Sequence, residues 1–397
     1  MNSLRWQILT FVLLLTAALD SNATQSAQDV HIGLASNFTE VSSSSSNPYG
    51  DYFRNGVRLA IKDAKLQLEN HKINLVLEEF DYGTNQVKVL DAAKRAANSS
   101  VIGVLGYNFS SHALLAAPIH QEAKLPMLTP SATADRIGKM GRYVHTACFN
   151  NTFMGKTLAQ VAWKRLKAHK AAIVVAVDCA YCADLAQGFE REFRALGGEI
   201  TVRTEILESD KDFSSVVDSL KRNPSKTYDV ILIPNQELSS ALVIGEILKA
   251  GINKPFLGGD GWGDVGSEFF KVIGKSDLNG YSVSHWHPEL KAPRSIKFAK
   301  EFEKEFGKQP NDTAVLAYDG MMLMIEALFH TKSHTRQGLE EALNGIKDFD
   351  GVTGHTHFMT GSAPLKSLTL LSAKNTAFTP IEMINPGQVS TGGHKHD

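Results

Sequence analysis

This 397-residue chain has neither an excess of charge of one sign nor a long hydrophobic run. Its 41 Lys and Arg residues balance 42 Asp and Glu residues, which leaves a formal net charge of −1. Such a surface gives no electrostatic reason to bind nucleic acid or an anionic membrane. The longest N-terminal apolar run has about 12 residues, too few for a bilayer that needs roughly 20 helical residues. We expect a small neutral or zwitterionic partner and no membrane-spanning helix.

The N-terminus has the layout of an export signal. Arg5 precedes the apolar run ILTFVLLLTAAL (residues 8–19), and the small-residue sequence Ser21-Asn22-Ala23 follows it. This order predicts a cleaved secretory signal over residues 1–23. No cysteine follows the run directly, so the sequence offers no lipid-attachment site there. We expect the mature protein to diffuse freely in a periplasm.

Two α/β lobes are predicted from length and from alternating patterns. The chain is longer than one hydrophobic core usually serves. Short β-rich runs alternate with helical periodicity, first in HIGLAS, INLVLEEF, VIGVLGY and PMLTPS, and again in AAIVVAVD, EITVRTEIL, DVILIPN and PFLGGDG. This alternation predicts parallel sheets with helices on their faces. The fold class is therefore α/β, with two doubly wound parallel-sheet lobes joined by hinge crossings.

The first helix shows the clearest periodicity. Phe53, Val57, Ala60 and Ala64 recur at helical spacing behind Asp51, which we assign as the N-cap.

Later segments are expected to complete the two lobes. Helices over residues 293–306, 312–329 and 337–345 and the strand-like LKSLTLL have no lobe of their own to form. We assign 28–148 with about 281–352 to lobe 1, 149–280 with about 353–385 to lobe 2, and 386–397 to a disordered tail. Ligands of open α/β sheets lie beyond the carboxyl ends of the strands, so the residues that follow each strand are the candidates.

Those positions carry a recognisable pattern. The stretches IGLASNF, YGDYFRNGVRLAIKDA, VIGVLGYNFSSHALLAAPIHQEAKLPMLTPSATA, VVAVDCAYCADLAQGFEREFRALGG and FLGGDGWGD resemble the leucine/isoleucine/valine-binding family of periplasmic proteins. The resemblance implies a type I periplasmic binding protein fold. It also implies a monomer that carries an amino acid between its lobes to a membrane ABC permease, without enzymatic activity, cofactor or metal.

The resemblance also assigns roles to individual residues. Ser110 and Thr133 would hold the α-carboxylate, and the Ser131 carbonyl and Asp260 would hold the ammonium. A zwitterion that leaves water needs both charges satisfied, and the helix that starts after Ser110 suits the carboxylate. The remaining ligand contacts would be Tyr181 from the second lobe and Tyr49 over the ligand side chain.

Two departures from the family pattern concern the ligand site. Gln236 and Glu237 stand after DVILIPN, and a polar or cationic ligand side chain would suit them if they face the ligand. Glu237 is equally explained as a solvated acid at a helix N-terminus. Tyr82 and Phe109 occupy the positions of a disulfide found in some members, where an aromatic contact would replace it.

The motif Cys179-Ala-Tyr-Cys182 leaves three alternatives open. At the end of a strand and the start of a helix it is typical of a redox pair, but a structural disulfide and two free thiols also fit it. Cys148 is the odd thiol, to which we assign no catalytic role.

Histidines at alternate positions are too common on surfaces to predict a metal site. No cysteine or carboxylate completes a recognisable ligand set around them. The three pairs are His285 with His287, His355 with His357, and His394 with His396.

Two other functions remain as alternatives. The same fold serves as a ligand sensor for a signalling partner, and the Cys179/Cys182 pair would suit a thiol oxidoreductase. Side-chain specificity of the ligand is not predicted.

Overall fold

The computed structural model describes residues 26–39, 49–83, 85–222, 227–263, 268–274, 278–359, 363–374 and 376–389. The expected signal sequence, the serine run 42–46 and the histidine pair at 394 and 396 lie outside these ranges. Part of the expected disordered tail is ordered instead. Pro386–Val389 form a short 3-10 helix, η4, that packs near α6 (Asn151–Gln160).

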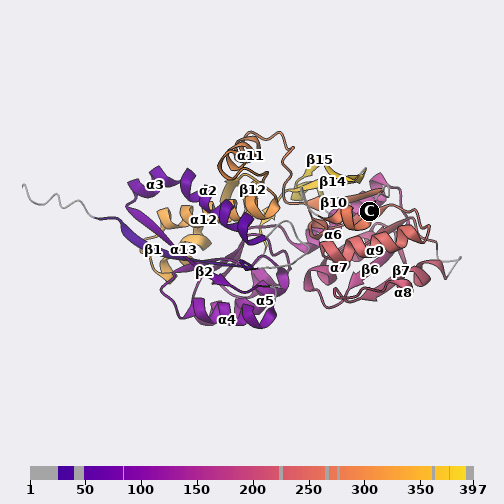
Figure 1. The fold of residues 1–397 in the computed structure, drawn as a ribbon, viewed down its shortest axis with the longest axis horizontal. Helices are drawn as coiled ribbons and strands as arrows, with labels where there is room; N and C mark the ends of the chain where they lie inside the picture. Colours follow the sequence, from indigo (N-terminus) through magenta and orange to yellow (C-terminus); the bar gives the residue numbers. More distant parts are fainter. Residues whose placement is uncertain are drawn as a thin grey trace, which may run out of the picture.

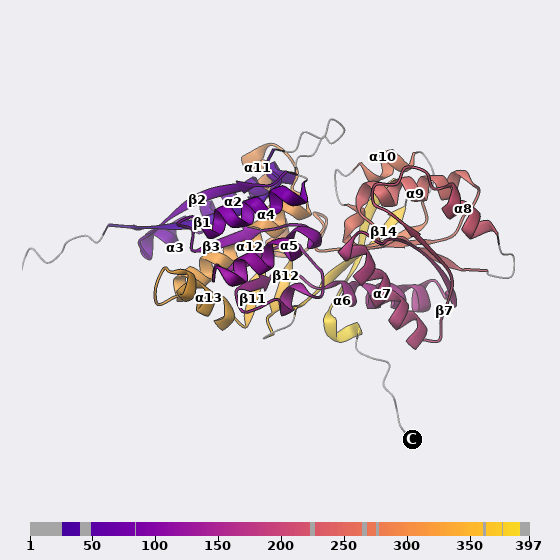
Figure 2. The same ribbon diagram turned by 90° about the horizontal axis from the view of Figure 1, so that it is seen from below.

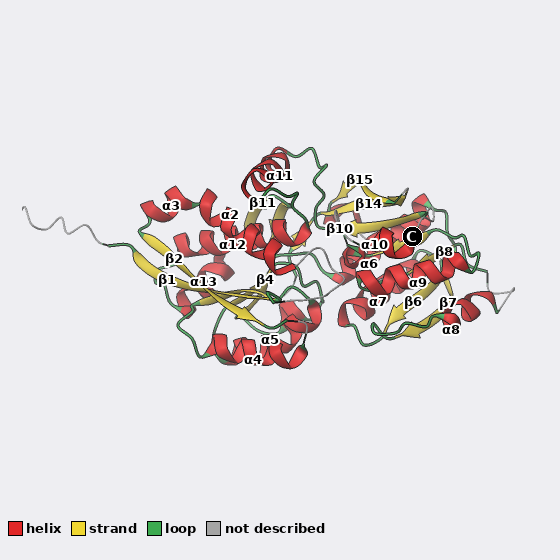
Figure 3. Cartoon of the chain, in the orientation of Figure 1, coloured by secondary structure: helices red, strands yellow, loops and turns green. Residues whose placement is uncertain are grey.

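The described chain forms two lobes that lie side by side (Figure 1). The sheet of the first lobe is parallel throughout, in the order β2-β1-β3-β4-β5. Figure 3 shows helices on both of its faces. The strands are β1 (Gln28–Ser36), β2 (Ile73–Asp81), β3 (Gly103–Gly106), β4 (Met127–Thr129) and β5 (Val144–Thr146). The helices are α2 (Tyr49–Asp63), α3 (Lys65–Asn70), α12 (Asp312–His330) and α13 (Arg336–Gly345) on one face, α4 (Gln86–Ala97) and α5 (Ser110–Glu122) on the other, and α11 (Pro293–Phe306) beside them.

The second lobe has a seven-stranded sheet in the order β15-β14-β10-β9-β8-β6-β7. Only β14 runs antiparallel to its two neighbours. The strands are β6 (Lys170–Ala176), β7 (Glu199–Ile206), β8 (Val230–Leu232), β9 (Phe256–Gly258), β10 (Gly280–Ser284), β14 (Leu368–Lys374) and β15 (Ala377–Ile384). Figure 2 shows α6 and α7 (Ala180–Ala195) on one face, and α8 (Ser214–Lys221), α9 (Glu237–Lys249) and α10 (Phe269–Ile273) on the other.

The buried parallel strands have the expected apolar sequences. In β6, six consecutive residues after Lys170 are buried, because helices cover both faces of this sheet. The predicted stripe of α2 is also found, since Phe53, Val57 and Ala60 are buried in the first core. Asp51 is not the N-cap: the helix begins at Tyr49, and Asp51 lies in its first turn and pairs with Arg54.

Within the described residues, the chain passes between the lobes three times: between β5 and α6, after β10, and before β14. The lobe boundaries predicted near residues 281 and 353 do not agree with the observed strand pairing. β10 pairs with β9 and β14 in the second sheet. A small antiparallel sheet of β11 (Asp348–Gly351), β12 (Gly354–His357) and β13 (Leu365–Lys366) packs Phe349 against the first core.

Within the residues that the structure describes, no helix combines the length and apolar character needed to cross a membrane.

Candidate functional site

The loops that follow β3 and β4 are tied together at one edge of the first sheet. The Ser131 hydroxyl donates to the Asn108 carbonyl at 2.9 Å, and Ser110 Oγ accepts from the Ala134 N–H at 3.1 Å. Because β3 and β4 are parallel neighbours, their carboxyl ends meet here. The predicted first-lobe residues Ser110 and Ser131 are therefore brought close to each other.

This edge presents donors suited to an anion. Ser110 is the first residue of α5, whose N-cap residue Phe109 provides no side-chain hydrogen bond. The first N–H groups of a helix have no partner within it, and its dipole favours negative charge. Thr133 is 3% exposed, and its hydroxyl has no hydrogen bond to another described residue. Tyr49 reaches the same loop through Phe109, with ring centroids 5.7 Å apart.

The aromatic contact expected between Tyr82 and Phe109 runs through a third ring. His112 meets the Tyr82 ring edge-to-face at 5.0 Å and the Phe109 ring at 5.5 Å. Burial lowers the pKa of His112 to about 4, so this bridging ring is neutral at neutral pH.

In the second lobe, Tyr181 supports the loop that carries Asp260. Tyr181 is only 5% exposed, and its hydroxyl accepts from the Gly261 N–H at 2.9 Å. Asp260 begins the 3-10 turn η3 (Asp260–Trp262) after β9. Burial, and next the charge of Asp260, raise the pKa of Tyr181 well above its usual value. Tyr181 thus braces the Asp260 loop as a neutral phenol.

The Asp260 carboxylate has one satisfied and one unsatisfied oxygen. Its Oδ2 lies 3.0 Å from Nε2 of His285, and its buried Oδ1 has no hydrogen-bond partner among the described residues. His285 directly follows β10, is 3% exposed, and stacks on Phe149 with centroids 4.1 Å apart. Burial lowers the pKa of His285, although Asp260 acts in the opposite direction. A buried carboxylate oxygen without a partner is costly, and a neutral imidazole does not balance its charge, so Asp260 is a candidate to bind a cation.

Asn151 connects the first-lobe and second-lobe residues. Its N–H donates to the Thr133 carbonyl at 2.9 Å, and its side-chain Nδ2 donates to the Tyr181 carbonyl at 3.4 Å. Sequence reasoning missed Asn151 and His285. The only signal for His285 in the sequence is its alternation with His287, a pattern that does not point to a carboxylate partner.

Gln236 and Glu237 lie at the start of α9 in the second lobe. Gln236 is the N-cap residue, and its N–H donates to Glu208 Oε1 at 3.1 Å. Glu237 lies in the first turn, where a carboxylate is stabilised by the helix dipole. Both side chains are partly exposed.

Comparison with known proteins agrees with this architecture. The family model for periplasmic binding proteins matches residues 29–375. The chain belongs to the periplasmic binding protein family. The Leu/Ile/Val-binding protein BraC3 of Rhizobium johnstonii is 26% identical over 62% of this chain and 66% of its own length. The chain thus aligns with just under two thirds of that relative.

Two solved structures share the fold over nearly their whole length. The leucine-binding protein LivK of Thermotoga maritima has a TM-score of 0.81 at 25% identity, covering 90% of this chain and 99% of that one. The branched-chain amino acid binding protein LivJ of Streptococcus pneumoniae, in complex with isoleucine, has a TM-score of 0.80 at 22% identity, covering 90% and 100%. The family and the type I periplasmic binding protein fold predicted from the sequence are confirmed.

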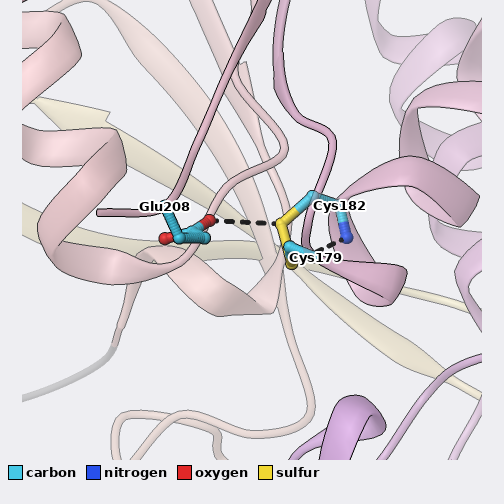
Figure 4. A group of neighbouring side chains, drawn as sticks. All are labelled: Cys179, Cys182 and Glu208. Atoms are coloured by element: carbon cyan, nitrogen blue, oxygen red, sulfur yellow. Dashed lines mark hydrogen bonds between the residues drawn. A yellow bond between two sulfur atoms is a disulfide. The ribbon is translucent and has the colours of Figure 1, made fainter. Parts of the chain in front are cut away.

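The three cysteines have distinct states in this periplasmic binding protein. Cys179 and Cys182 form a disulfide (Figure 4). Cys148 is free and buried. Of the alternatives left open by the sequence, two free thiols are thus excluded for this structure. Burial raises the pKa of Cys148 to about 12, which makes it a poor nucleophile.

The described histidine pairs bind carboxylates or backbone groups. His285 contacts Asp260, and His287 Nδ1 accepts from the Glu289 N–H. On the exposed face of the small sheet, His355 contacts Asp350 and His357 contacts Asp348, each at 2.8 Å.

Proposed function

We propose that this protein is the periplasmic solute-binding component of an ABC uptake system. It captures an amino acid or amino-acid-like molecule as its two lobes close, and it hands the closed form to a membrane permease. Closure requires only that the ligand contact the closed form better than the open one. The family match and the names of the relatives support this role. Export, a monomeric state and the absence of enzymatic activity are parts of the same proposal.

The observation that carries the proposal is the half-satisfied carboxylate of Asp260. An ammonium group would satisfy its buried Oδ1, while the N–H groups of α5 and the Thr133 hydroxyl receive a carboxylate. In this role Ser110, Ser131, Thr133 and Asp260 hold the zwitterion, and Tyr49 contacts the ligand side chain. Tyr181 acts mainly by bracing Asp260.

The ligand side chain is the least constrained part of the proposal. Gln236 and Glu237, the polar pair at the start of α9, favour a polar or cationic side chain if the closed form brings them to the ligand. A thermal-shift screen against the twenty amino acids, short amides and aromatic acids tests the proposal, because a ligand bound only by the native state raises its melting temperature. Hits among amino acids support it. A melting temperature that none of the amino acids raises contradicts the zwitterion site.

A further inference from the structure

The Cys179–Cys182 disulfide lies where β6 ends and α7 begins (Figure 4). Cys179 is the N-cap residue of α7, and its sulfur accepts the Cys182 N–H at 3.2 Å. Cys179 retains 9% of its surface, whereas Cys182 is fully buried. Backbone N–H donors at a helix N-terminus stabilise a thiolate, so a reduced Cys179 would be the more reactive sulfur.

A partly buried carboxyl group faces the inner sulfur. Glu208, which follows β7, places Oε1 3.3 Å from Cys182 Sγ, as Figure 4 shows. Burial raises the pKa of Glu208, and the nearby charge of Asp178 raises it further. The Gln236 N–H, the Ser239 hydroxyl and Lys211 act in the opposite direction. Glu208 can therefore hold a proton at a higher pH than an exposed glutamate, directly beside Cys182.

A purely structural role explains this disulfide poorly. In the chain-entropy model the stabilisation from a cross-link grows with the length of the loop that it closes. This bond closes a loop with only two residues between the cysteines, in a helix turn already packed into the second core.

We propose that the Cys179–Cys182 disulfide is redox-active and exchanges with low-molecular-weight thiols, with Glu208 as the proton donor and acceptor for Cys182. A thiolate attacks Cys179 Sγ, the S–S bond breaks, and Cys182 leaves and takes the proton of Glu208. A second thiolate attacks the sulfur of the bound thiol, which releases the oxidised small-molecule disulfide and the Cys179 thiolate. Two electrons pass from two thiols to the protein disulfide, and water returns the proton to Glu208. This activity is separate from solute binding and does not depend on it.

The test exposes the full native chain to reduced glutathione and follows the reaction by acid quench, alkylation in guanidinium and mass measurement. An oxidised chain takes one label, at Cys148, and a reduced chain takes three. We expect conversion to three labels without denaturant. We expect Glu208→Gln to slow it about a hundredfold near neutral pH, the low end of the loss that is typical for one acid–base group. The matched control Glu205→Gln, an exposed glutamate of β7, should react like the unchanged chain.

Two results would overturn the proposal. In one, the native chain keeps a single label in glutathione until guanidinium unfolds it. In the other, Glu208→Gln reacts at the unchanged rate, which removes Glu208 from the exchange.

Variants that keep one cysteine of the pair keep the test decisive if Glu208→Gln does not fold. Cys182→Ser leaves the Cys179 thiol, and Cys179→Ser leaves the Cys182 thiol. We expect iodoacetamide to modify the Cys179 thiol of native Cys182→Ser roughly tenfold faster than the Cys182 thiol of native Cys179→Ser. Cys179 is more exposed, and its thiolate is stabilised by the helix N-terminus. Equal rates would contradict the assignment of Cys179 as the attacked sulfur.

Discussion

Asp260 and His285 join the proposed ammonium site to an interlobe crossing. Nε2 of His285 lies 3.0 Å from Oδ2 of Asp260, and the same imidazole ring stacks on Phe149 in the crossing between β5 and α6. The Asp260 carboxylate, which would contact the ligand, is therefore held by His285 in the crossing after β10. His285 in turn packs on Phe149 in the crossing between β5 and α6. We expect ligand affinity to depend on this imidazole although it need not touch the ligand.

Replacing His285 by alanine should weaken amino-acid binding about tenfold, since a hydrogen bond to a charged group is worth roughly 1.5–3 kcal/mol. His285→Gln, which keeps an N–H donor, should recover most of the affinity. Titration calorimetry on both variants gives the comparison. Unchanged affinity in His285→Ala would show that Asp260 does not need this partner.

His285 should also make the native state sensitive to acid. Burial lowers its folded pKa, so the unfolded chain takes up the proton first. The native state then loses stability as the pH falls below about 6.5, the pKa of histidine in the unfolded chain. Above that pH, His285 does not lower the free energy of unfolding through its protonation. Urea unfolding at pH 8 and pH 5 should show a smaller loss of stability in His285→Gln than in the unchanged chain. An identical loss in both proteins would contradict this account.

Thr133→Ala should weaken amino-acid binding by about 1–3 kcal/mol, because in the proposed site its hydroxyl, which has no partner among the described residues, would donate to the ligand carboxylate. Thr133→Ser is the matched control, since it keeps the hydroxyl. If both variants bind as the unchanged chain does, Thr133 is not part of the site.

Asp184→Asn should raise the melting temperature at pH 7. Burial, and next the charge of Asp135, raise the pKa of Asp184, so its ionised form destabilises the native state. That penalty is full above the folded pKa and disappears below about pH 3.9, the unfolded value. Thermal unfolding across this range should show the gain at pH 7 fading as the pH falls. A gain that is independent of pH would point to packing instead of charge.

The sequence was sufficient to predict the two lobes and the gathering of Ser110 with Ser131. Buried parallel strands are nearly continuous apolar runs, and parallel neighbours end at the same edge, so the lobes and the meeting of the strand ends follow from local patterns. The family resemblance singled out Ser110 and Ser131 themselves. The contacts at the interlobe crossings were harder to predict. His285 contacts Asp260, 25 positions away, and Asn151 is hydrogen-bonded to Thr133 and Tyr181, so neither residue has a local sequence signature for its contacts.

Short polar segments were also missed. β11 and β12 alternate exposed aspartate and histidine with buried or partly buried residues over only four positions each, too short for a periodicity to be recognised. Tyr181 was expected to contact the ligand; its hydroxyl accepts the Gly261 N–H and keeps its own proton to donate, so that contact stays a prediction. Only the folded geometry shows which groups remain available.

The most direct test of the zwitterion site is a calorimetric comparison of the tightest-binding amino acid with the same molecule lacking its amino group, on the unchanged chain and on Asp260→Asn. The account predicts that the unchanged chain prefers the amino acid by at least about tenfold, or roughly 1.4 kcal/mol, and that Asp260→Asn loses this preference. A preference of the same size in both proteins would contradict the central claim that Asp260 binds the ligand ammonium.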